Sequence, residues 1–300
     1  MTSIQVERIL NKLKLELKKQ HHNFYLVEAS PWPFVISWAL FFFVLVTVGN
    51  FHDWFPSIDW KGSLIFNSLF WNKFLPLFLV LAGIKYWAED VIGIGLFEGK
   101  QSSNVNANYK MGFFLFIVSE AVFFLGIFWA FIHLAIVPSY VIGVCWPPRG
   151  LETIDKFLVP VCNTLVLLCS GISITWSHRA FLENKREDSL KGLEITVILG
   201  IVFLLLQFLE YKGQDSFVIS STSYYSAFYF ATGFHGFHVF IGTVFLIISL
   251  QRFLNNEYTQ EKHIWYEVSI WYWHFVDIIW LFVYLVIYYW GGEPRSFVWY

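Results

Sequence analysis

The sequence predicts an all-α polytopic membrane protein with seven transmembrane helices. Of its 300 residues, 57% are hydrophobic and only 14% are charged, whereas soluble domains are about 25% charged. Aromatic residues make up 21% of the chain, with 34 Phe, 15 Trp and 15 Tyr, which suits packing within a membrane and at its interfaces. Seven segments also reach the roughly 20 apolar residues that a helix needs to cross a bilayer.

The seven segments follow one another with short polar linkers. The first is the shortest, and the second contains Pro76 and Gly83, which makes its ends less distinct. The third and sixth are long, which indicates tilt or protrusion beyond the bilayer. The predicted spans are Pro33–Phe51, Phe74–Ile94, Tyr109–Ile136, Phe157–His178, Ser189–Tyr211, Tyr224–Leu254 and Val268–Trp290.

The distribution of positive charge predicts the orientation of these helices. If the N-terminus and every second loop lie on one side, that side carries 14 of the 20 lysines and arginines, and the other side carries 6. Positively charged loops remain on the cytoplasmic side of a membrane, which corresponds to the matrix side in a mitochondrion. We therefore expect the N-terminus to face the cytoplasm or matrix and the C-terminus to face the opposite side.

Residues 3–20 form a separate basic element. Val6, Leu10, Leu13 and Leu17 recur at helical spacing and give it one apolar face, while lysines cover much of the rest. Such a helix can lie on an anionic leaflet, dock on a partner subunit or remain solvated, and the sequence leaves these alternatives open. The predicted domains are a basic amphipathic extension at residues 1–22, a membrane domain at 23–291 and a tail at 292–300.

Composition and motifs exclude several function classes. A net charge of −2 gives no sign of nucleic-acid binding. The three cysteines, Cys145, Cys162 and Cys169, lack metal-binding spacing and are read as small core residues. No helix has the pair of widely spaced histidines used by membrane b-type haem sites, and copper would need a cluster of Cys, His and Met. Because no phosphate-binding loop, nucleophile elbow or zinc-protease motif occurs either, the chain itself is predicted to carry no redox centre and no catalytic triad.

A lone carboxylate lies deep in the third predicted span. Glu120 follows the start of that span by 11 residues, which places it about 16 Å from the inner end at 1.5 Å per residue. An unpaired carboxylate at this depth is costly and takes up a proton. We favour a functional role for Glu120, as a proton-linked or lipid-contacting group. The alternative is a protonated acid that hydrogen-bonds to a neighbouring helix.

The last two spans carry four polar side chains at matching depth. His235 and His238 are three residues apart on one helix face, and His274 and Asp277 have the same spacing on the next span. The two spans are antiparallel neighbours, so Asp277 could reach a histidine. We predict a structural polar clasp of these four residues and disfavour half of a metal site, because further ligands would be needed nearby. Glycines of the sixth span also indicate a close helix contact: Gly233, Gly236 and Gly242.

Several rare strings of aromatic and polar residues occur along the chain in a fixed order. They are Ser30–Pro33, Asp90–Ile92, Leu115–Glu120, Phe128–Phe131, Cys145–Pro148, Asn163–Thr164, Ser170–Trp176, Leu206–Gln207 with Glu210–Tyr211, the His235/His238 segment and Trp271–Asp277. Together these strings resemble cytochrome c oxidase subunit III, a family of the haem–copper oxidases. The resemblance covers roughly residues 22–291, and it rests on the order of the strings rather than on any one of them.

The resemblance implies a seven-helix subunit of the terminal respiratory oxidase, which reduces O2 to water and pumps protons. The first two helices would be splayed from the other five, with a cleft that holds phospholipids such as cardiolipin or phosphatidylglycerol. Haem and copper would be held by the neighbouring core subunits I and II and not by this chain. The implied role is to stabilise the catalytic core and support proton uptake, and Glu120 matches the buried carboxylate of the family.

The resemblance also guides the choice of lipid-binding and partner-binding segments. Arg252, at the inner end of the sixth span, matches a family arginine and is the first candidate to meet a lipid phosphate. The family usually has arginines after the second span, and because this chain lacks them there, Lys100 or Lys85 is expected to replace them. Three segments look lineage-specific and are expected to contact additional small subunits: residues 1–20, the loop Asn50–Trp71 and the tail Glu293–Tyr300.

The resemblance also predicts the cellular location of the protein and the functions that are the closest alternatives. The Phe-rich, Met-poor composition and the style of the match favour the mitochondrial inner membrane, with the N-terminus in the matrix and the C-terminus in the intermembrane space. A bacterial plasma membrane is the alternative. An accessory subunit of a quinol oxidase or nitric-oxide reductase would share the fold, and the electron donor docks elsewhere. A transporter or receptor is disfavoured, because no internal repeat and no polar central pocket is evident.

Overall fold

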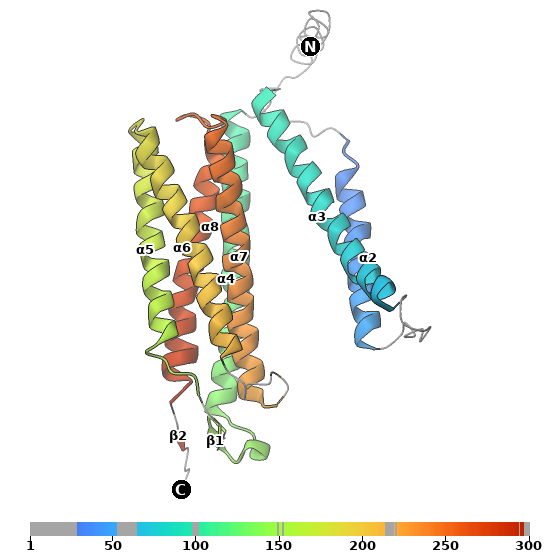
Figure 1. The fold of residues 1–300 in the computed structure, drawn as a ribbon, viewed down its shortest axis with the longest axis vertical. Coiled ribbons are helices and arrows are strands. Elements are labelled where there is room, and N and C mark those ends of the chain that lie inside the picture. The colour runs from blue at the N-terminus through green and yellow to red at the C-terminus, as the bar shows by residue number, and fades with distance from the viewer. Residues whose placement is uncertain are drawn as a thin grey trace, which may run out of the picture. The chain divides into compact units, whose positions relative to one another are not determined.

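The computed structural model describes residues 29–52, 65–97, 102–148, 150–151, 153–213, 219, 221–293 and 295–296. The chain forms two compact units, Met1–Asn108 and Tyr109–Tyr300. In the described ranges every long element is a helix, as Figure 1 shows. The predicted basic helix at residues 3–20, residues 53–64 of the predicted loop and Lys100 lie outside these ranges.

The first unit contains a helical hairpin of α2 (Trp32–Phe51) and α3 (Ile65–Phe97). Pro33 lies in the first turn of α2, where its missing N–H removes no helical hydrogen bond. The Trp32 ring stacks on Tyr86 at a centroid distance of 5.3 Å, and its Nε1 donates to Asp90 of α3. Because a Cβ on Gly83 would lie 2.7 Å from Ile36 Cγ1, the glycine lets the two helices approach closely.

The second unit is built mainly from five long helices, which run side by side in Figure 1. Helix α4 starts in the first unit and continues through the second. At Tyr284 the last helix passes into a π-helical segment, η2, which continues the same rod. The bounds are α4 (Ser103–Ile136), α5 (Val159–Leu182), α6 (Arg186–Lys212), α7 (Ser223–Leu254), α8 (Ile264–Val283) and η2 (Tyr284–Trp290).

Two tryptophans of α8 anchor it to α5. The indole N–H of Trp273 donates to Ser170 Oγ at 2.9 Å, and that of Trp280 donates to Thr164 Oγ1 at 2.9 Å. Both rings are fully buried. Each indole therefore buries a large apolar surface while its single donor is satisfied by a hydroxyl of the neighbouring helix, as a buried Trp requires.

Helices α5 and α6 approach each other at small residues. A Cβ on Gly192 of α6 would lie 2.8 Å from Ser177 Cβ and 2.9 Å from the carbonyl oxygen of Ser173. The Ser173 hydroxyl lies 2.7 Å from that of Thr196, so a polar contact accompanies the close backbone approach. Small residues and hydroxyl hydrogen bonds are typical of helix contacts within membranes.

The end of the unit that carries the C-terminus is closed by a short antiparallel strand pair. Strand β1 (Cys145–Trp146) pairs with β2 (Arg295–Ser296), and η1 (Tyr140–Ile142) precedes β1. Lys156 donates to Glu293 Oε1 at 2.6 Å, and this hydrogen bond raises the pKa of Lys156. The connection between α4 and α5 is therefore tied to the tail that follows η2.

The predicted spans agree with the helices that form. Among the described residues, six helices are long and apolar enough to cross a membrane, and the remaining predicted span, Phe74–Ile94, lies within α3. Most of the helices extend a few residues beyond the apolar segments, because hydrogen bonding of the backbone continues into the polar ends. The extension is greatest in α3, which begins nine residues before the predicted start at Phe74.

The close helix contact predicted for three glycines of α7 holds for one of them. A Cβ on Gly242 would lie 3.1 Å from Cε3 of Trp273, so α8 packs directly against this position. At Gly233 and Gly236 no other helix of the described chain approaches closely, because a Cβ there would have no atom of another described element within 4 Å. The other close approaches in the second unit include Gly192 and Gly200, both on α6.

Candidate functional site

Glu120 and His238 join α4 to α7. Oε2 of Glu120 lies 2.9 Å from Nε2 of His238, and the histidine side chain is 7% exposed. Nδ1 of His238 lies 2.7 Å from the carbonyl oxygen of Phe234, so Nδ1 carries a proton. Nε2 then either accepts a hydrogen bond from the Glu120 acid or donates one to its carboxylate. In both forms the two side chains share one proton, and the net charge of the pair is zero.

His235 belongs to a different contact. Its Nε2 lies 3.1 Å from the carbonyl oxygen of Val276 and donates to it, while its ring lies 5.2 Å from that of Trp280. The residue is fully buried. His235 therefore fixes α7 against the backbone of α8, and it does so without any side-chain acid.

His274 and Asp277 face α5 rather than α7. Nε2 of His274 lies 3.3 Å from Thr175 Oγ1, and a Cβ on Gly171 would lie 3.1 Å from Oδ2 of Asp277. Oδ1 of Asp277 is buried with no hydrogen-bond partner in the described chain. His274, Asp277 and Gly171 line a groove of about 490 Å³ that also includes Arg179.

The four residues predicted to form one polar clasp thus take part in three separate contacts. The described contacts do not bring Asp277 to a histidine of α7. The reason is the rotation of α8, whose Trp273, Val276 and Trp280 point into the helix bundle and leave His274 and Asp277 on the side of α5. Sequence spacing identified which residues share a helix face but not which neighbour that face meets.

A second buried carboxylate was not singled out from the sequence. Oε2 of Glu210 accepts hydrogen bonds from Tyr288 at 2.8 Å and from Gln207 at 2.8 Å. Gln207 in turn accepts from Asn163 of α5 at 3.3 Å. The signal was present in the sequence, because Gln207 and Glu210 are spaced i, i+3 near the end of an apolar span. This network connects α5, α6 and η2.

Arg252 lies at the end of α7 and is 9% exposed. Its Nε donates to Glu257 Oε2 at 2.8 Å, and its guanidinium lies 4.8 Å from the centroid of the Tyr258 ring. Burial raises the pKa of Tyr258, so the phenol remains neutral beneath the cation. The guanidinium predicted to meet a lipid phosphate is therefore already paired with a carboxylate of its own loop.

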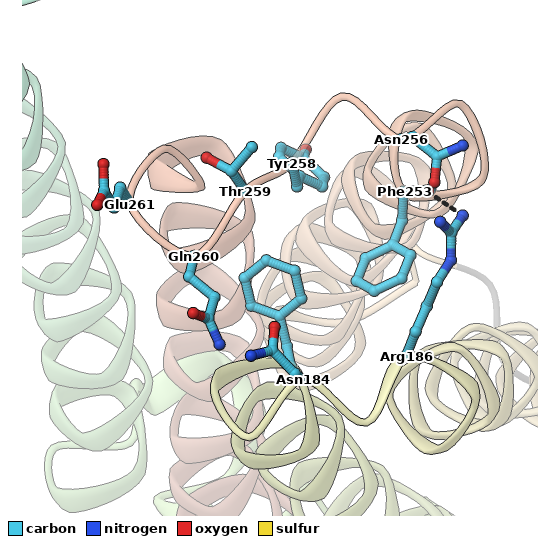
Figure 2. A pocket seen from close by; sticks show the side chains of 9 residues that line it. Asn184, Arg186, Phe253, Asn256, Tyr258, Thr259, Gln260 and Glu261 are labelled. Atoms are coloured by element: carbon cyan, nitrogen blue, oxygen red, sulfur yellow. Dashed lines mark hydrogen bonds between the residues drawn. The ribbon is translucent and has the colours of Figure 1, made fainter.

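A cavity of about 530 Å³ opens beside this loop, between the α5–α6 turn and the α7–α8 connection (Figure 2). Phe181, Phe253 and Tyr258 supply apolar walls, and amide side chains lie at its rim. Figure 2 shows Arg186 reaching across from α6, where it donates to the carbonyl oxygen of Phe253 at 3.1 Å.

The other sequence candidates differ in their surroundings. Lys85 on α3 is exposed and lies 3.7 Å from Glu89, four residues further along the helix. Cys162 and Cys169 were expected in the core but are exposed, whereas Cys145 is buried. One group of metal-ligand atoms comes together among the described residues, at the end of α5 and the start of α8: His178, His263 and Glu267.

Similarity to known proteins covers nearly the whole chain. A family model described as cytochrome c oxidase subunit III matches residues 22–292. The chain belongs to the cytochrome c oxidase subunit III family. A subunit 3 from Chondrus crispus is 41% identical over 274 residues, which covers 91% of this chain and 96% of the relative. Subunits 3 from Branchiostoma floridae and Drosophila melanogaster are 43% and 40% identical, and each alignment covers 91% of this chain and 98% of the relative.

Membership of the cytochrome c oxidase subunit III family gives the helices their context. The chain is a membrane-embedded subunit of an oxidoreductase complex of the respiratory chain, and it is itself non-catalytic. The polar pairs within its spans accord with that role, because each joins one helix to another: Glu120 with His238, His235 with Val276, and His274 with Thr175.

Proposed function

We propose that the chain stabilises the catalytic core of cytochrome c oxidase, made of subunits I and II, and supports proton uptake by that core. Haem and copper belong to those partner subunits. The observation that carries the proposal is the use of polar groups within the spans. Glu120 and His238 satisfy each other across two helices, which makes them a structural contact rather than part of a continuous path for protons or electrons.

The proposed location is the mitochondrial inner membrane, with the N-terminus in the matrix. The contact of Lys110 with Glu267 joins the first turns of α4 in this unit to the start of α8. The contact of Arg186 with Phe253 joins the start of α6 to the end of α7. Together with the end of α5, these helix ends lie at one end of the second unit. That end carries most of the unit's lysines and arginines, which supports a matrix orientation. A bacterial plasma membrane would give the same charge pattern.

Structural phospholipids, such as cardiolipin or phosphatidylglycerol, form the second part of the proposal. Arg252, Lys85 and Lys100 are the proposed contacts for lipid phosphates. Many large apolar side chains on the outside of the helices are exposed in the isolated chain, including Phe114, Leu115 and Trp129, and these need lipid or partner helices to cover them. Arg252 would bind a phosphate by sharing or exchanging its contact with Glu257.

Additional small subunits are the proposed partners of three segments: residues 1–20, the loop Asn50–Trp71 and the C-terminal tail. Asp277 supports a partner contact within the membrane as well. Its Oδ1 is buried without a partner beside an open groove between α5 and α8. Because an unsatisfied carboxyl in a membrane is costly, we assign the groove to a helix of a neighbouring subunit that donates a hydrogen bond to Asp277.

Purification of the complex that contains this chain tests the proposal. Extraction in mild detergent should give an a-type haem spectrum and copper in the complex, and the separated chain should show no oxidase turnover. A complex with b-type haem alone, oxidising quinol, would replace cytochrome c oxidase by a quinol oxidase. Turnover by the single chain would contradict the accessory role.

A further inference from the structure

Two polar groups of α8 face the groove between α5 and α8 at the same level. A Cβ on Gly171 of α5 would lie 3.1 Å from Oδ2 of Asp277 and 3.8 Å from Nδ1 of His274. The missing side chain of Gly171 therefore leaves room for both groups. Because Gly171 lies near the middle of the 24-residue α5, the two groups lie at the depth where a membrane is most apolar.

The hydrogen bonding of Thr175 sets the tautomer of His274. The Thr175 hydroxyl donates to the carbonyl oxygen of Gly171 at 2.8 Å. Since its only proton is used there, Oγ1 of Thr175 accepts a hydrogen bond from Nε2 of His274, which lies 3.3 Å away. Nε2 therefore carries the proton, and Nδ1 of the neutral ring presents a lone pair. His274 thus offers the groove an acceptor and no donor.

Asp277 adds further acceptors beside His274. Its Oδ1 is buried with no hydrogen-bond partner in the described chain. An ionised carboxylate only accepts hydrogen bonds, and a protonated one brings a single O–H to a site with several acceptor positions. The two side chains therefore accept more hydrogen bonds than they can donate. Because unsatisfied polar groups are costly within a membrane, whatever fills the groove must bring donors to this level.

A phospholipid does not supply donors at this depth. Arg179 lines the groove in the last turn of α5. It follows Gly171 by eight residues, which corresponds to about 12 Å along the helix axis at 1.5 Å per residue. A lipid whose phosphate met Arg179 would place its acyl chains beside His274 and Asp277. Because acyl chains donate no hydrogen bonds, the lipid would leave both acceptors unsatisfied.

We propose that a transmembrane helix of a neighbouring subunit fills the groove and presents a side chain with at least two N–H donors to Asp277 and to Nδ1 of His274. Arginine, lysine, asparagine and glutamine have such donors, whereas a hydroxyl has one proton and serves one acceptor. The inference rests on the proposed function, because it requires a neighbouring subunit, and it names the chemistry of the helix that meets Asp277.

Apolar side chains on both sides of these acceptors suit the same helix. Leu168, Ile172 and Trp176 line the groove, and all three are exposed in the isolated chain. They follow one another at a spacing of four residues along α5, so they form one stripe that runs parallel to the groove. A helix packed against this stripe covers apolar surface along its length and needs a polar side chain only at the level of Gly171.

Photocross-linking of the intact purified complex identifies what fills the groove. Ile172 is 70% exposed, so its replacement by photoreactive benzoylphenylalanine should leave the fold of the chain intact. Peptide mass spectrometry should recover a transmembrane peptide of another subunit. That peptide should carry Arg, Lys, Asn or Gln within about two helical turns of the cross-link. The matched control replaces Ile198, which is exposed on α6 and does not line the groove, and it should not capture this peptide.

Two substitutions of His274 test the direction of its lone pair. An asparagine amide occupies the position of Nδ1, and a glutamine amide occupies that of Nε2. His274→Asn should therefore keep the acceptor toward the groove, whereas His274→Gln should keep only the contact with Thr175. After dilution in detergent, the dissociated fraction of the subunit should be about threefold higher for His274→Gln, the factor that corresponds to an average hydrogen bond between membrane helices.

Three results would overturn the proposal. They are cross-links from Ile172 to lipid alone, cross-links to a helix that lacks all four nitrogen-bearing residues near the contact, and equal dissociation of the two His274 variants. Each of these would leave the accessory role standing, provided that the complex retains its a-type haem spectrum and oxidises cytochrome c. A complex with b-type haem that oxidises quinol would instead contradict the proposed function, whatever the groove holds.

Discussion

Oε2 of Glu120 and Nε2 of His238 lie 2.9 Å apart and connect α4 with α7 within the membrane-spanning part of the second unit. The Nδ1–H of His238 is already committed to the carbonyl oxygen of Phe234. The pair can therefore be neutral, with an acid donating to imidazole, or ionic, with imidazolium donating to carboxylate. A medium of low dielectric constant penalises separated charges, so we expect the neutral form.

The first prediction concerns this proton. Glu120→Gln should keep a donor opposite His238, preserve assembly, and retain most electron transfer and proton pumping. The side chain of Glu120 is 25% exposed, so in the wild type it should react with apolar carboxyl reagents that need a protonated acid. Glu120→Gln has no carboxyl group and should abolish this labelling. Infrared difference spectra of the wild type should contain an acid C=O stretch that the variant loses.

Truncation of the side chain at the same position separates a structural role of Glu120 from a chemical one. Glu120→Ala leaves His238 without its partner, and hydrogen bonds between membrane helices average about 0.6 kcal/mol. The complex should become slightly less stable while its turnover remains. A carboxylate band for Glu120 at pH 7 would disprove the neutral pair. Loss of pumping by an assembled Glu120→Gln complex would require a direct role in proton transfer.

The sequence predicted the helices well, because a span of apolar residues has few alternatives in a membrane. It placed Glu120 deep in the third span and four polar residues of the last two spans at matching depth, but it did not predict their partners. His235 and His238 share a helix face, yet one contacts α8 and the other contacts α4. Which helix each histidine contacts depends on how the helices are arranged and rotated in the bundle. The helical period of 3.6 residues gives information about neither.

Glu210 is a second residue whose surroundings could not be predicted from the sequence. It lies one residue before the end of the predicted span Ser189–Tyr211, and the sequence gives no sign that it is buried. In the structure it is 5% exposed and is held by Tyr288, which is 78 residues away in the sequence. Burial of a helix end depends on what covers it, and only the packing of η2 reveals that cover.

The second prediction concerns Asp277. Its Oδ1 has no partner in the described chain, so Asp277→Ala removes no internal hydrogen bond and should leave the isolated chain about as stable as before. If a neighbouring subunit donates to this carboxyl, the variant should be retained less well in the complex during detergent washes. Retention can be measured by quantitative mass spectrometry. Asp277→Asn, which keeps an acceptor oxygen, is the control and should be retained better than the alanine variant.

Turnover per assembled complex should be unchanged in both Asp277 variants. Normal retention with lost turnover would show that Asp277 acts in chemistry. Normal retention with normal turnover would show that no partner donates to it, and the groove between α5 and α8 would then be filled by lipid.

The third prediction compares two glycines on different helices. A Cβ on Gly192 would meet Ser177 Cβ at 2.8 Å and the Ser173 carbonyl oxygen at 2.9 Å, whereas a Cβ on Gly126 would have no atom within 4 Å. Overpacking typically costs about 1–3 kcal/mol, and the helix propensity of alanine returns up to about 1 kcal/mol. Gly192→Ala should therefore destabilise the subunit, and Gly126→Ala should not. Thermal unfolding of the purified complex measures both.

The fourth prediction uses the pH dependence of the contact between Lys156 and Glu293. The hydrogen bond raises the pKa of Lys156 above its ordinary value, which is about 10.4 for a lysine. Its stabilising effect is thus complete below the ordinary value and is lost as the pH rises through the raised one. Thermal dissociation of the subunit from pH 8 to 11 should show this alkaline loss in the wild type, and Lys156→Gln should flatten it. Identical curves would show that the contact does not form in solution.

The last prediction concerns lipid at Arg252. The guanidinium donates to Glu257 at 2.8 Å and lies over the ring of Tyr258, so a lipid phosphate must compete with an internal carboxylate. One positive charge near a membrane surface contributes about 1 kcal/mol toward anionic lipid. Arg252→Gln should therefore retain fewer anionic lipids in native mass spectrometry of the intact complex.

Glu257→Gln should have the opposite effect, because it frees the guanidinium while preserving the shape of the loop. Lys262→Gln, on the same connection and exposed, controls for general surface charge. Equal lipid retention in the Arg252 and Lys262 variants, or fewer lipids in Glu257→Gln, would remove Arg252 from the lipid site and leave it as a brace for the loop between α7 and α8.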